Sequence, residues 1–363
     1  MAENEDGRLK SLRDQIDALD ERLVALLNER ARLAIEVGHI KHETGAPVFR
    51  PEREAEVLQR AAALNAGPLA PAHVGHILRE VISACRALER PQTVAYLGPA
   101  GTYSEMAMQR QFGSSVTGLP CSTLDEVFRA TEAGNADLAI VPIENSSEGA
   151  VSRTLDLLLA TPLSMAAEVS ISVQHNLLTK SGSMNGVTRV CAHSQALAQC
   201  AAWLNQNWPL LERQPVSSNA EAARMASQDP TVAAIAGETA VRHYDVQTVA
   251  AQIQDDTHNR TRFAVLAMPS TQPSTPSAHD KTSLILSVPN KAGAVFHMLS
   301  PLAAHGVSMT RFESRPARVG TWEYYFYVDV EGHVEEPKVA RALAELQQAC
   351  AFYKCLGSYP EAR

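Results

Sequence analysis

Arg30 gives the clearest chemical signal in this sequence, because it interrupts an apolar helical pattern. Over residues 9–40, leucine, isoleucine and valine recur at steps of three and four, and Arg30 falls between Leu26 and Leu33, where the pattern requires an aliphatic side chain. A guanidinium in an apolar seam costs several kcal/mol unless an anion meets it. Because no acidic residue belongs to the seam, we expect the carboxylate of a bound ligand to be the partner.

Helix geometry places two further cations relative to Arg30. Lys41 follows Arg30 by eleven residues, so both lie on nearly the same face, about 16 Å apart, and can converge on one small ligand. Arg13 precedes Arg30 by seventeen residues, about 25 Å along the same helix. If Arg13 binds the same ligand, it must come from a second subunit, which predicts an intertwined helical homodimer. The alternative is a plain dimeric coiled coil in which Arg30 only sets the register.

The elements that must position these residues divide the chain into four parts. Residues 1–91 are predicted to be all helical. Residues 92–268 alternate short buried strands with helices, which predicts an α/β domain with parallel strands in two small sheets. Residues 269–281 are rich in proline, serine and threonine and are predicted to be a linker. Residues 282–363 have the order βαββαβ, which predicts a ferredoxin-like α+β domain.

Composition and charge limit the partners and the compartment. A net charge of −8 argues against nucleic acid and anionic membranes as partners, and no stretch is apolar enough to span a bilayer. The six cysteines form no C-x-x-C motif and no zinc-binding spacing, so no metal site is expected. The acidic, polar N-terminus differs from a signal peptide. We therefore expect a cytoplasmic protein with reduced thiols.

Several spaced motifs of residues 8–90 resemble the all-helical chorismate mutase domain. They are L-R-D-Q-I-D-A-L-D at 12–20, N-E-R ending at Arg30, V-G-H-I-K ending at Lys41, and R-P-E-R-E at 50–54. The resemblance implies a Claisen rearrangement of chorismate to prephenate in a domain-swapped dimer. A pericyclic reaction needs no nucleophile, metal or cofactor; it needs the diaxial conformer held and a donor beside the ether oxygen.

The resemblance also implies roles for individual side chains. Arg13, Arg30 and Arg53 would clamp the two carboxylates of the substrate, for which the fork of a guanidinium is well suited. Lys41 would donate a hydrogen bond to the ether oxygen, which gains negative charge in the transition state. Glu54 would accept a hydrogen bond from the ring hydroxyl. Taken alone, Arg53 and Glu54 are ordinary surface charges, and only the combined motif assigns them to a site.

Three substrate-contact positions depart from the pattern of that family. Arg50 stands where we expect an acid, Cys85 where we expect a serine, and Glu89 where we expect a glutamine. An ionised carboxylate can only accept hydrogen bonds. If Glu89 assists the ether oxygen, it must therefore carry a proton during the reaction.

Polar residues in the second part follow predicted strands, where α/β sheets place ligands. Taken singly, each such group could equally be a helix cap or an ion-paired turn. Together, Y-L-G-P-A-G-T-Y-S at 96–104, V-P-I-E-N-S at 141–146 and T-R-F at 261–263 resemble prephenate dehydratase over residues 93–267. The resemblance implies a two-lobed fold like that of a periplasmic binding protein, with the site in the cleft between the lobes.

The reaction implied is loss of water and carbon dioxide from prephenate, giving phenylpyruvate. Aromatisation supplies the driving force, so no cofactor is expected. The family assigns the essential hydroxyl to the threonine of T-R-F, here Thr261, which would hydrogen-bond the leaving hydroxyl within a polarised network. Glu144 is a candidate for the group that supplies the proton. The expected substrate contacts are Arg262, Asn145, Ser146 and Gln199.

Residues 282–360 resemble an ACT domain, a module that senses amino acids. The sequence G-A-V-F at 293–296 is a variant of the glycine-led effector motif of that family, and E-S-R-P at 313–316 is the second motif. A glycine at a helix start lets backbone N–H groups approach a ligand carboxylate. The resemblance implies L-phenylalanine as an allosteric inhibitor; the alternative is a structural dimerisation module. The expected effector contacts are Gly293, Ala294, Val295, Glu313, Ser314, Arg315 and Pro316.

The three resemblances together predict a bifunctional chorismate mutase and prephenate dehydratase of phenylalanine biosynthesis. Its substrates would be chorismate and prephenate, and L-phenylalanine would inhibit it. The alternative is a non-catalytic amino-acid sensor with a coiled-coil dimeriser, a binding-protein-like cleft and an effector domain. Arg30 in the apolar seam, together with the T-R-F motif at 261–263, favours the enzyme.

Overall fold

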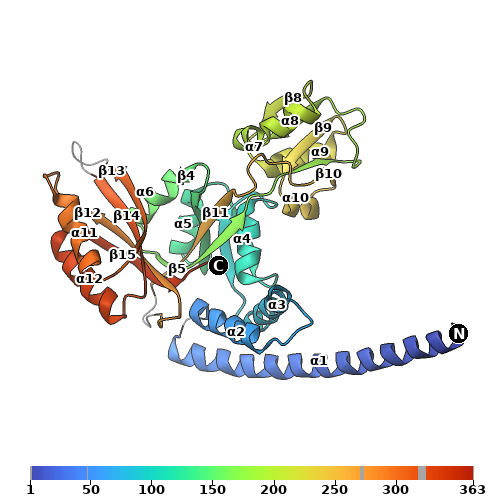
Figure 1. The fold of residues 1–363 in the computed structure, drawn as a ribbon, viewed down its shortest axis with the longest axis horizontal. Coiled ribbons are helices and arrows are strands. Elements are labelled where there is room, and N and C mark those ends of the chain that lie inside the picture. The colour runs from blue at the N-terminus through green and yellow to red at the C-terminus, as the bar shows by residue number, and fades with distance from the viewer. Residues whose placement is uncertain (1, 47, 270–273, 318–323, 363) are drawn as a thin grey trace.

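The computed structural model describes residues 2–46, 48–269, 274–317 and 324–362. Along the chain a helical domain is followed by a two-lobed α/β domain and by a C-terminal α+β domain, as Figure 1 shows. This is the multidomain architecture predicted from the sequence. Within the described ranges, no helix combines the length and the apolar character needed to cross a membrane.

The helical domain consists of α1 (Ala2–Thr44), α2 (Pro51–Leu64) and α3 (Pro71–Glu89). Proline at the first helical position starts α2 and α3, since its missing N–H is not needed there. The C-terminal part of α1 packs closely on α3. A Cβ atom on Gly38 would lie 3.0 Å from the Cα of Glu89, so a glycine allows this approach.

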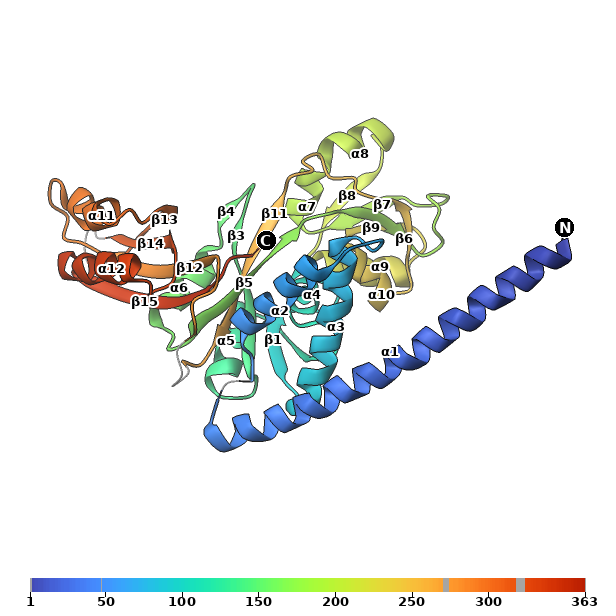
Figure 2. The same ribbon diagram turned by 60° about the horizontal axis from the view of Figure 1, so that its bottom comes forward.

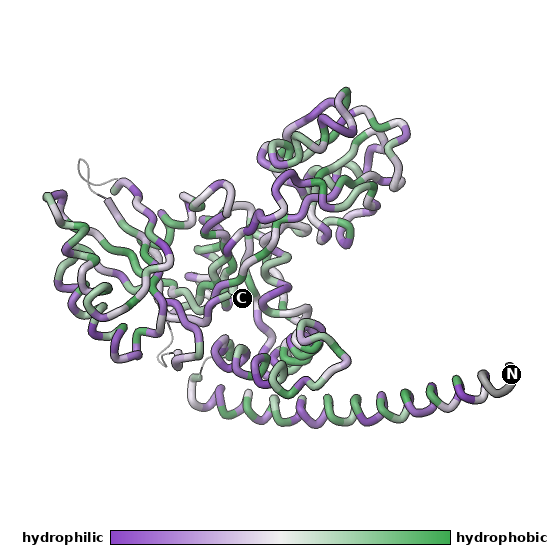
Figure 3. Tube along the Cα trace, viewed as in Figure 1, coloured by the Kyte–Doolittle hydropathy of each residue, from purple (hydrophilic) through white to green (hydrophobic). Residues whose placement is uncertain are grey.

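The N-terminal part of α1 extends away from the rest of the chain, as both views show (Figures 1 and 2). Every described side chain from residue 6 to residue 29 is exposed. These include the predicted apolar seam: Leu12 is 49% exposed and Leu26 is 60% exposed. Figure 3 shows hydrophobic and hydrophilic residues alternating along this helix. The apolar pattern is therefore helical, as predicted, and uncovered within one chain.

The two-lobed domain has one sheet in each lobe, ordered β2-β1-β3-β11-β5 with β4 beside β3 in the first lobe, and β10-β6-β9-β7-β8 in the second. The first lobe contains β1 (Thr93–Leu97), α4 (Tyr103–Phe112), β2 (Thr117–Cys121), α5 (Leu124–Glu132), β3 (Leu138–Asn145), β4 (Gly149–Ala150), α6 (Ser152–Ala160), β5 (Ser164–Ser172) and β11 (Arg260–Ala267). The second contains β6 (Asn176–Thr179), β7 (Arg189–Ala192), α7 (Ser194–Gln199), α8 (Ala201–Asn207), β8 (Glu212–Pro215), α9 (Asn219–Gln228), β9 (Val232–Ala236), α10 (Glu238–His243) and β10 (Gln247–Ala250).

Both sheets are mixed, so the prediction of parallel sheets was only partly correct. β1 pairs in parallel with β2 and β3, and β7 pairs in parallel with β8 and β9. β11 runs antiparallel to both β3 and β5, and β6 runs antiparallel to β9 and β10. The physical reason is the return of the chain from the second lobe, which inserts β11 into the first sheet from the opposite end.

The C-terminal domain has the predicted order βαββαβ and a sheet ordered β13-β14-β12-β15. β12 begins at Asp280, so the last two residues of the predicted linker belong to a strand, and residues 270–273 of that linker lie outside the described residues. The elements are β12 (Asp280–Ser287), α11 (Ala294–Ala304), β13 (Met309–Pro316), β14 (Tyr324–Glu331), α12 (Pro337–Ala349) and β15 (Phe352–Pro360).

The two faces of this sheet have different neighbours, because side chains alternate along each strand. Leu284 and Val328 face the core shared with α11 and α12. Ile285 and Tyr327 face the first lobe and share its core with α6. The hydroxyl of Tyr327 donates a hydrogen bond to the carbonyl of Leu155 at 2.7 Å. The C-terminal domain is thus joined to the first lobe by an apolar interface.

Candidate active sites

The helical domain contains a pocket of about 1090 Å³ beside the C-terminal part of α1, α2 and α3. With one exception, the residues predicted for the mutase site line it. The exception is Arg13, which lies seventeen residues before Arg30 on the exposed part of α1. A single chain therefore assembles the rest of the predicted set: Arg30, Lys41, Arg50, Arg53, Glu54, Cys85 and Glu89.

The cations of this pocket differ in their partners. Lys41 Nζ lies 2.7 Å from Glu89 Oε2 and donates to the carbonyl of Val48 at 3.3 Å. Arg53 pairs with Glu56 of the same helix, 2.5 Å away, and is 63% exposed. By contrast, no carboxylate in the described part of the chain lies within ion-pair distance of Arg30. Its guanidinium is therefore not occupied by an internal carboxylate of the described residues, and its binding to an anionic ligand stays a prediction.

Sequence analysis missed Arg86, which is only 4% exposed and also lines the pocket. Its guanidinium donates to the carboxylate of Glu54 and, at 2.7 Å, to the carbonyl of Phe112. Burial raises the pKa of Glu54, and Arg86 is the strongest of the charges that oppose this rise. Arg86 extends the series of Leu78 and Ile82 at intervals of four, so the signal that identified Arg30 was present here as well.

One wall of the pocket comes from distant parts of the sequence. Residues 275–279, just before β12, and Pro360 and Glu361, at the end of β15, contribute to the lining. Periodicity cannot predict such contacts, because they depend on how the C-terminal domain packs against the helices.

The hydroxyl of Thr261 belongs to a hydrogen-bonded cluster between β3 and β11. Thr261 lies opposite Asn145 in the strand register, and Asn145 Nδ2 lies 2.9 Å from Thr261 Oγ1. The same amide donates to Asn259 Oδ1 at 2.8 Å. Ser146 Oγ accepts from the backbone N–H of Arg260 at 2.9 Å. The structure thus brings together three predicted site residues, Thr261, Asn145 and Ser146.

Gln199 lies in a second cluster, where the chain crosses between the lobes. Its Oε1 is 2.9 Å from His175 Nε2, and His175 Nδ1 is 3.1 Å from the hydroxyl of Tyr103. Burial lowers the pKa of His175, which favours the neutral ring. Gln199 Nε2 is buried and has no hydrogen-bond partner among the described residues, so it is a free donor for a ligand. His175 was not predicted, and its sequence context carries no signal for it.

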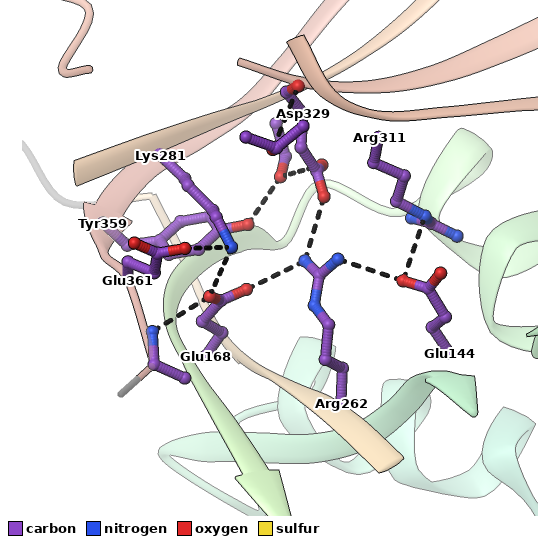
Figure 4. Close-up of polar contacts among 11 residues, drawn as sticks. Glu144, Glu168, Arg262, Lys281, Arg311, Asp329, Tyr359 and Glu361 are labelled. Atoms are coloured by element: carbon purple, nitrogen blue, oxygen red, sulfur yellow. Dashed lines mark hydrogen bonds and ion pairs between the residues drawn. The ribbon is translucent and has the colours of Figure 1, made fainter. Parts of the chain in front are cut away.

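Arg262 does not face the cluster around Thr261. Adjacent residues of a strand point to opposite faces, and Arg262 points toward the C-terminal domain (Figure 4). It pairs with Glu144 at 3.0 Å, Glu168 at 2.8 Å and Asp329 at 2.9 Å. The structure thus places Arg262, which was predicted to contact substrate, in an interdomain ion cluster. Glu144, the suggested proton donor, is engaged in the same cluster and is turned away from Thr261.

The predicted effector residues occupy two separate elements of the C-terminal domain. Gly293 caps α11 with φ of 77°, a conformation that favours glycine, and Ala294 and Val295 begin the helix. In β13 the alternation turns Arg315 toward the first lobe, where it pairs with Asp156 at 2.9 Å. Glu313 has the same orientation as Arg315, whereas Ser314 and Pro316 lie on the opposite, exposed face.

Comparison with known proteins agrees with this architecture. Family models match residues 12–90 (chorismate mutase type II), 94–271 (prephenate dehydratase) and 282–348 (ACT domain). A bifunctional chorismate mutase/prephenate dehydratase of Neisseria gonorrhoeae is 47% identical over 100% of this chain and 99% of the relative. One from Pseudomonas aeruginosa is 43% identical over 98% of each chain. The crystal structure of an Arthrobacter aurescens prephenate dehydratase in complex with L-Phe covers 74% of this chain and 90% of that one, with 32% identity and a TM-score of 0.69.

The fold and the family matches define a multidomain enzyme with two catalytic domains and an ACT domain. The chain belongs to the family of bifunctional chorismate mutase/prephenate dehydratases. The prediction of a bifunctional enzyme is confirmed over that of a non-catalytic sensor.

Proposed function

We propose that the pocket of the helical domain converts chorismate to prephenate, and that the clusters around Thr261 and Gln199 then convert prephenate to phenylpyruvate. The observation that carries the first step is the pocket itself, in which Lys41 and Glu54 lie with Arg30, whose guanidinium has no carboxylate partner among the described residues. The second step is supported by the threonine hydroxyl held by Asn145. The free thiols of all six cysteines suit a cytoplasmic enzyme.

In the mutase pocket the side chains bind and orient the substrate without covalent chemistry. Arg30 and Arg53 bind the carboxylates of chorismate, and Lys41 donates to the ether oxygen as the C–O bond breaks. Glu54 accepts from the ring hydroxyl. Arg50 and Cys85 complete the wall around the substrate.

In the dehydratase site the ring of prephenate loses its hydroxyl as water and its carboxylate as carbon dioxide. The electron pair of the broken carbon–carbon bond completes the aromatic ring, and the leaving hydroxyl takes up one proton. Thr261 hydrogen-bonds this hydroxyl, with its orientation fixed by Asn145. Ser146 and Gln199 bind the rest of the substrate, Gln199 through its unpaired Nε2.

Substitution Thr261→Ala should abolish dehydration and spare the mutase. We expect at least about a hundredfold loss of phenylpyruvate formation from prephenate, because the leaving hydroxyl loses its hydrogen-bond partner. Loss of chorismate, followed spectrophotometrically in the same sample, should be unchanged. Thr257→Ala, at an exposed threonine of the same segment, is the matched control. Full dehydratase activity in Thr261→Ala would refute the assignment.

Glu89→Gln should raise kcat/KM for chorismate, because an amide donates a hydrogen bond to the ether oxygen and an ionised carboxylate cannot. A protonated Glu89 donates to the ether oxygen, whereas an ionised one only accepts and holds Lys41, which lies 2.7 Å away. Glutamine at this position donates at every pH. The measurement is kcat/KM for chorismate across pH, with Glu43→Gln on the exposed side of α1 as the control. Values for Glu89→Gln no higher than those of the unaltered enzyme would exclude this role.

We further propose a homodimer in which α1 of each chain covers the seam of the other. The uncovered leucines of α1 support this arrangement, since an exposed apolar stripe of this length needs a partner. Arg13 of one chain would then complete the pocket that contains Arg30 of its partner. Each mutase site would consist of residues from both subunits.

A mixture of two inactive variants tests this sharing. Arg13→Ala and Arg30→Ala should each lack mutase activity, because each removes a clamp from every site. When the two variants are unfolded together and refolded, heterodimers contain one intact site, and about a quarter of the unaltered activity should return. Each variant refolded alone is the control. A mixture as inactive as its components would contradict a shared site.

We propose L-phenylalanine as the effector of the C-terminal domain. The backbone N–H groups that follow Gly293 at the start of α11 can donate hydrogen bonds to the carboxylate of L-phenylalanine. The exposed Ser314 lies on β13 of the same domain. The pairing of Arg315 with Asp156 connects this same strand, β13, to α6 of the first lobe. The main-chain donors of Gly293 suit any α-amino acid. We expect the side chain of phenylalanine because phenylpyruvate, the product of dehydration, carries the same side chain.

Titration with L-phenylalanine should therefore lower the dehydratase rate several-fold at saturation. L-phenylalanine would bind more tightly to a less active arrangement of the domains and would therefore shift the population toward that arrangement. D-phenylalanine at equal concentration is the control. A dehydratase rate that does not respond to L-phenylalanine would remove this proposal.

A further inference from the structure

Arg86 is enclosed at the junction of the helical domain and the first lobe. One guanidinium nitrogen donates to the carboxylate of Glu54, and another donates to the carbonyl of Phe112 at 2.7 Å. Its central carbon lies 5.7 Å from the ring centre of Phe49 and 5.4 Å from that of Phe112. The guanidinium is thus fixed by two hydrogen-bonded partners and two aromatic rings, which leaves it little freedom to reorient.

Both partners of Arg86 belong to functional elements. Glu54 lines the mutase pocket. Phe112 is the last residue of α4, the helix that begins with Tyr103 of the dehydratase cluster. The carbonyl end of a helix attracts a cation, so this contact holds the guanidinium in place from the side of the first lobe. Arg86 therefore spans from the mutase pocket to the neighbouring domain.

We propose that Arg86 is a positioning residue of the mutase reaction, which fixes the carboxylate of Glu54 so that it remains ionised and accepts the hydroxyl of the substrate. This inference rests on the proposed function of the pocket. Arg86 acts through Glu54 and is itself held by the first lobe. The active geometry of the mutase pocket thus depends on a contact with the dehydratase domain.

The electrostatic surroundings of Glu54 support this role. Burial favours its protonated form and raises its pKa. The cations that oppose this effect are Arg86 first, then Arg79 of α3 and Lys41 of α1. Lys41 is itself paired with Glu89. Removal of Arg86 therefore leaves Glu54 protonated up to a higher pH, where it no longer accepts a hydrogen bond through both oxygens.

The test uses the full chain with Arg86→Met, which keeps the length of the side chain but removes its charge. We expect kcat/KM for chorismate to fall by about tenfold or more, and the acidic limb of its pH profile to move to higher pH. A merely structural residue would not move this limb. Arg90→Met is the matched control, because Arg90 also joins α3 to the first lobe, through Asp137, and does not touch Glu54.

Two further variants keep the test decisive. In a Glu54→Gln background, Arg86→Met should cause almost no additional loss, because its effect passes through the carboxylate. Arg86→Lys, which retains the charge, should restore the position of the acidic limb in part. Dehydratase activity on prephenate reports in each sample whether the chain is folded.

The outcomes separate the two claims. The role of Arg86 would be overturned if Arg86→Met lowered kcat/KM as strongly in the Glu54→Gln background as in the unaltered enzyme. It would also be overturned if the acidic limb stayed in place in both Arg86→Met and Arg86→Lys. Loss of dehydration in Arg86→Met to the same extent as mutase activity, with no shift of the acidic limb, would also make it a folding residue. Absence of chorismate turnover in the unaltered enzyme would instead overturn the proposed function of the pocket.

Discussion

A guanidinium held away from bulk water requires anions around it, and this requirement organises the junctions between the domains. Arg86 meets it with Glu54 and the carbonyl of Phe112, between the helices and the first lobe. Arg262 meets it with three carboxylates from the first lobe and the C-terminal domain. Arg30 has no such anion among the described residues. Internal partners thus give Arg86 and Arg262 a structural role, whereas Arg30 is left to pair with a ligand in the proposed site.

The strand β11 shows how one segment can serve two purposes. Because its side chains alternate, Thr261 reaches the cluster with Asn145, while Arg262 reaches Asp329 of the C-terminal domain. Lys281 adds a second cation to this junction, 3.1 Å from Glu168. The strand that carries the dehydratase threonine is therefore tied directly to the domain that resembles a regulatory module.

The mutase pocket also depends on more than its own domain. Its walls include residues 275–279 and the end of β15, and its glutamate is held through a contact with α4. The close approach of α1 and α3 at Gly38 brings Lys41 to Glu89. In the intact chain, the helical domain, residues 275–279 and the end of β15 thus line one pocket, and the first lobe contributes only through the contact of Phe112 with Arg86.

The amino-acid sequence alone was enough to predict the kinds of elements and most of the residues that gather in the pocket and around Thr261. The helical repeat around Arg30, the strand–helix alternation and the order βαββαβ are local patterns, because each reflects which face of one element is buried. The remaining features depend on how the domains pack. The antiparallel insertion of β11, the orientation of Arg262 and the capture of Glu54 by Arg86 all depend on contacts between distant parts of the chain. Local periodicity predicts that a side chain is buried. Which charged group that side chain contacts depends on how the domains pack against one another.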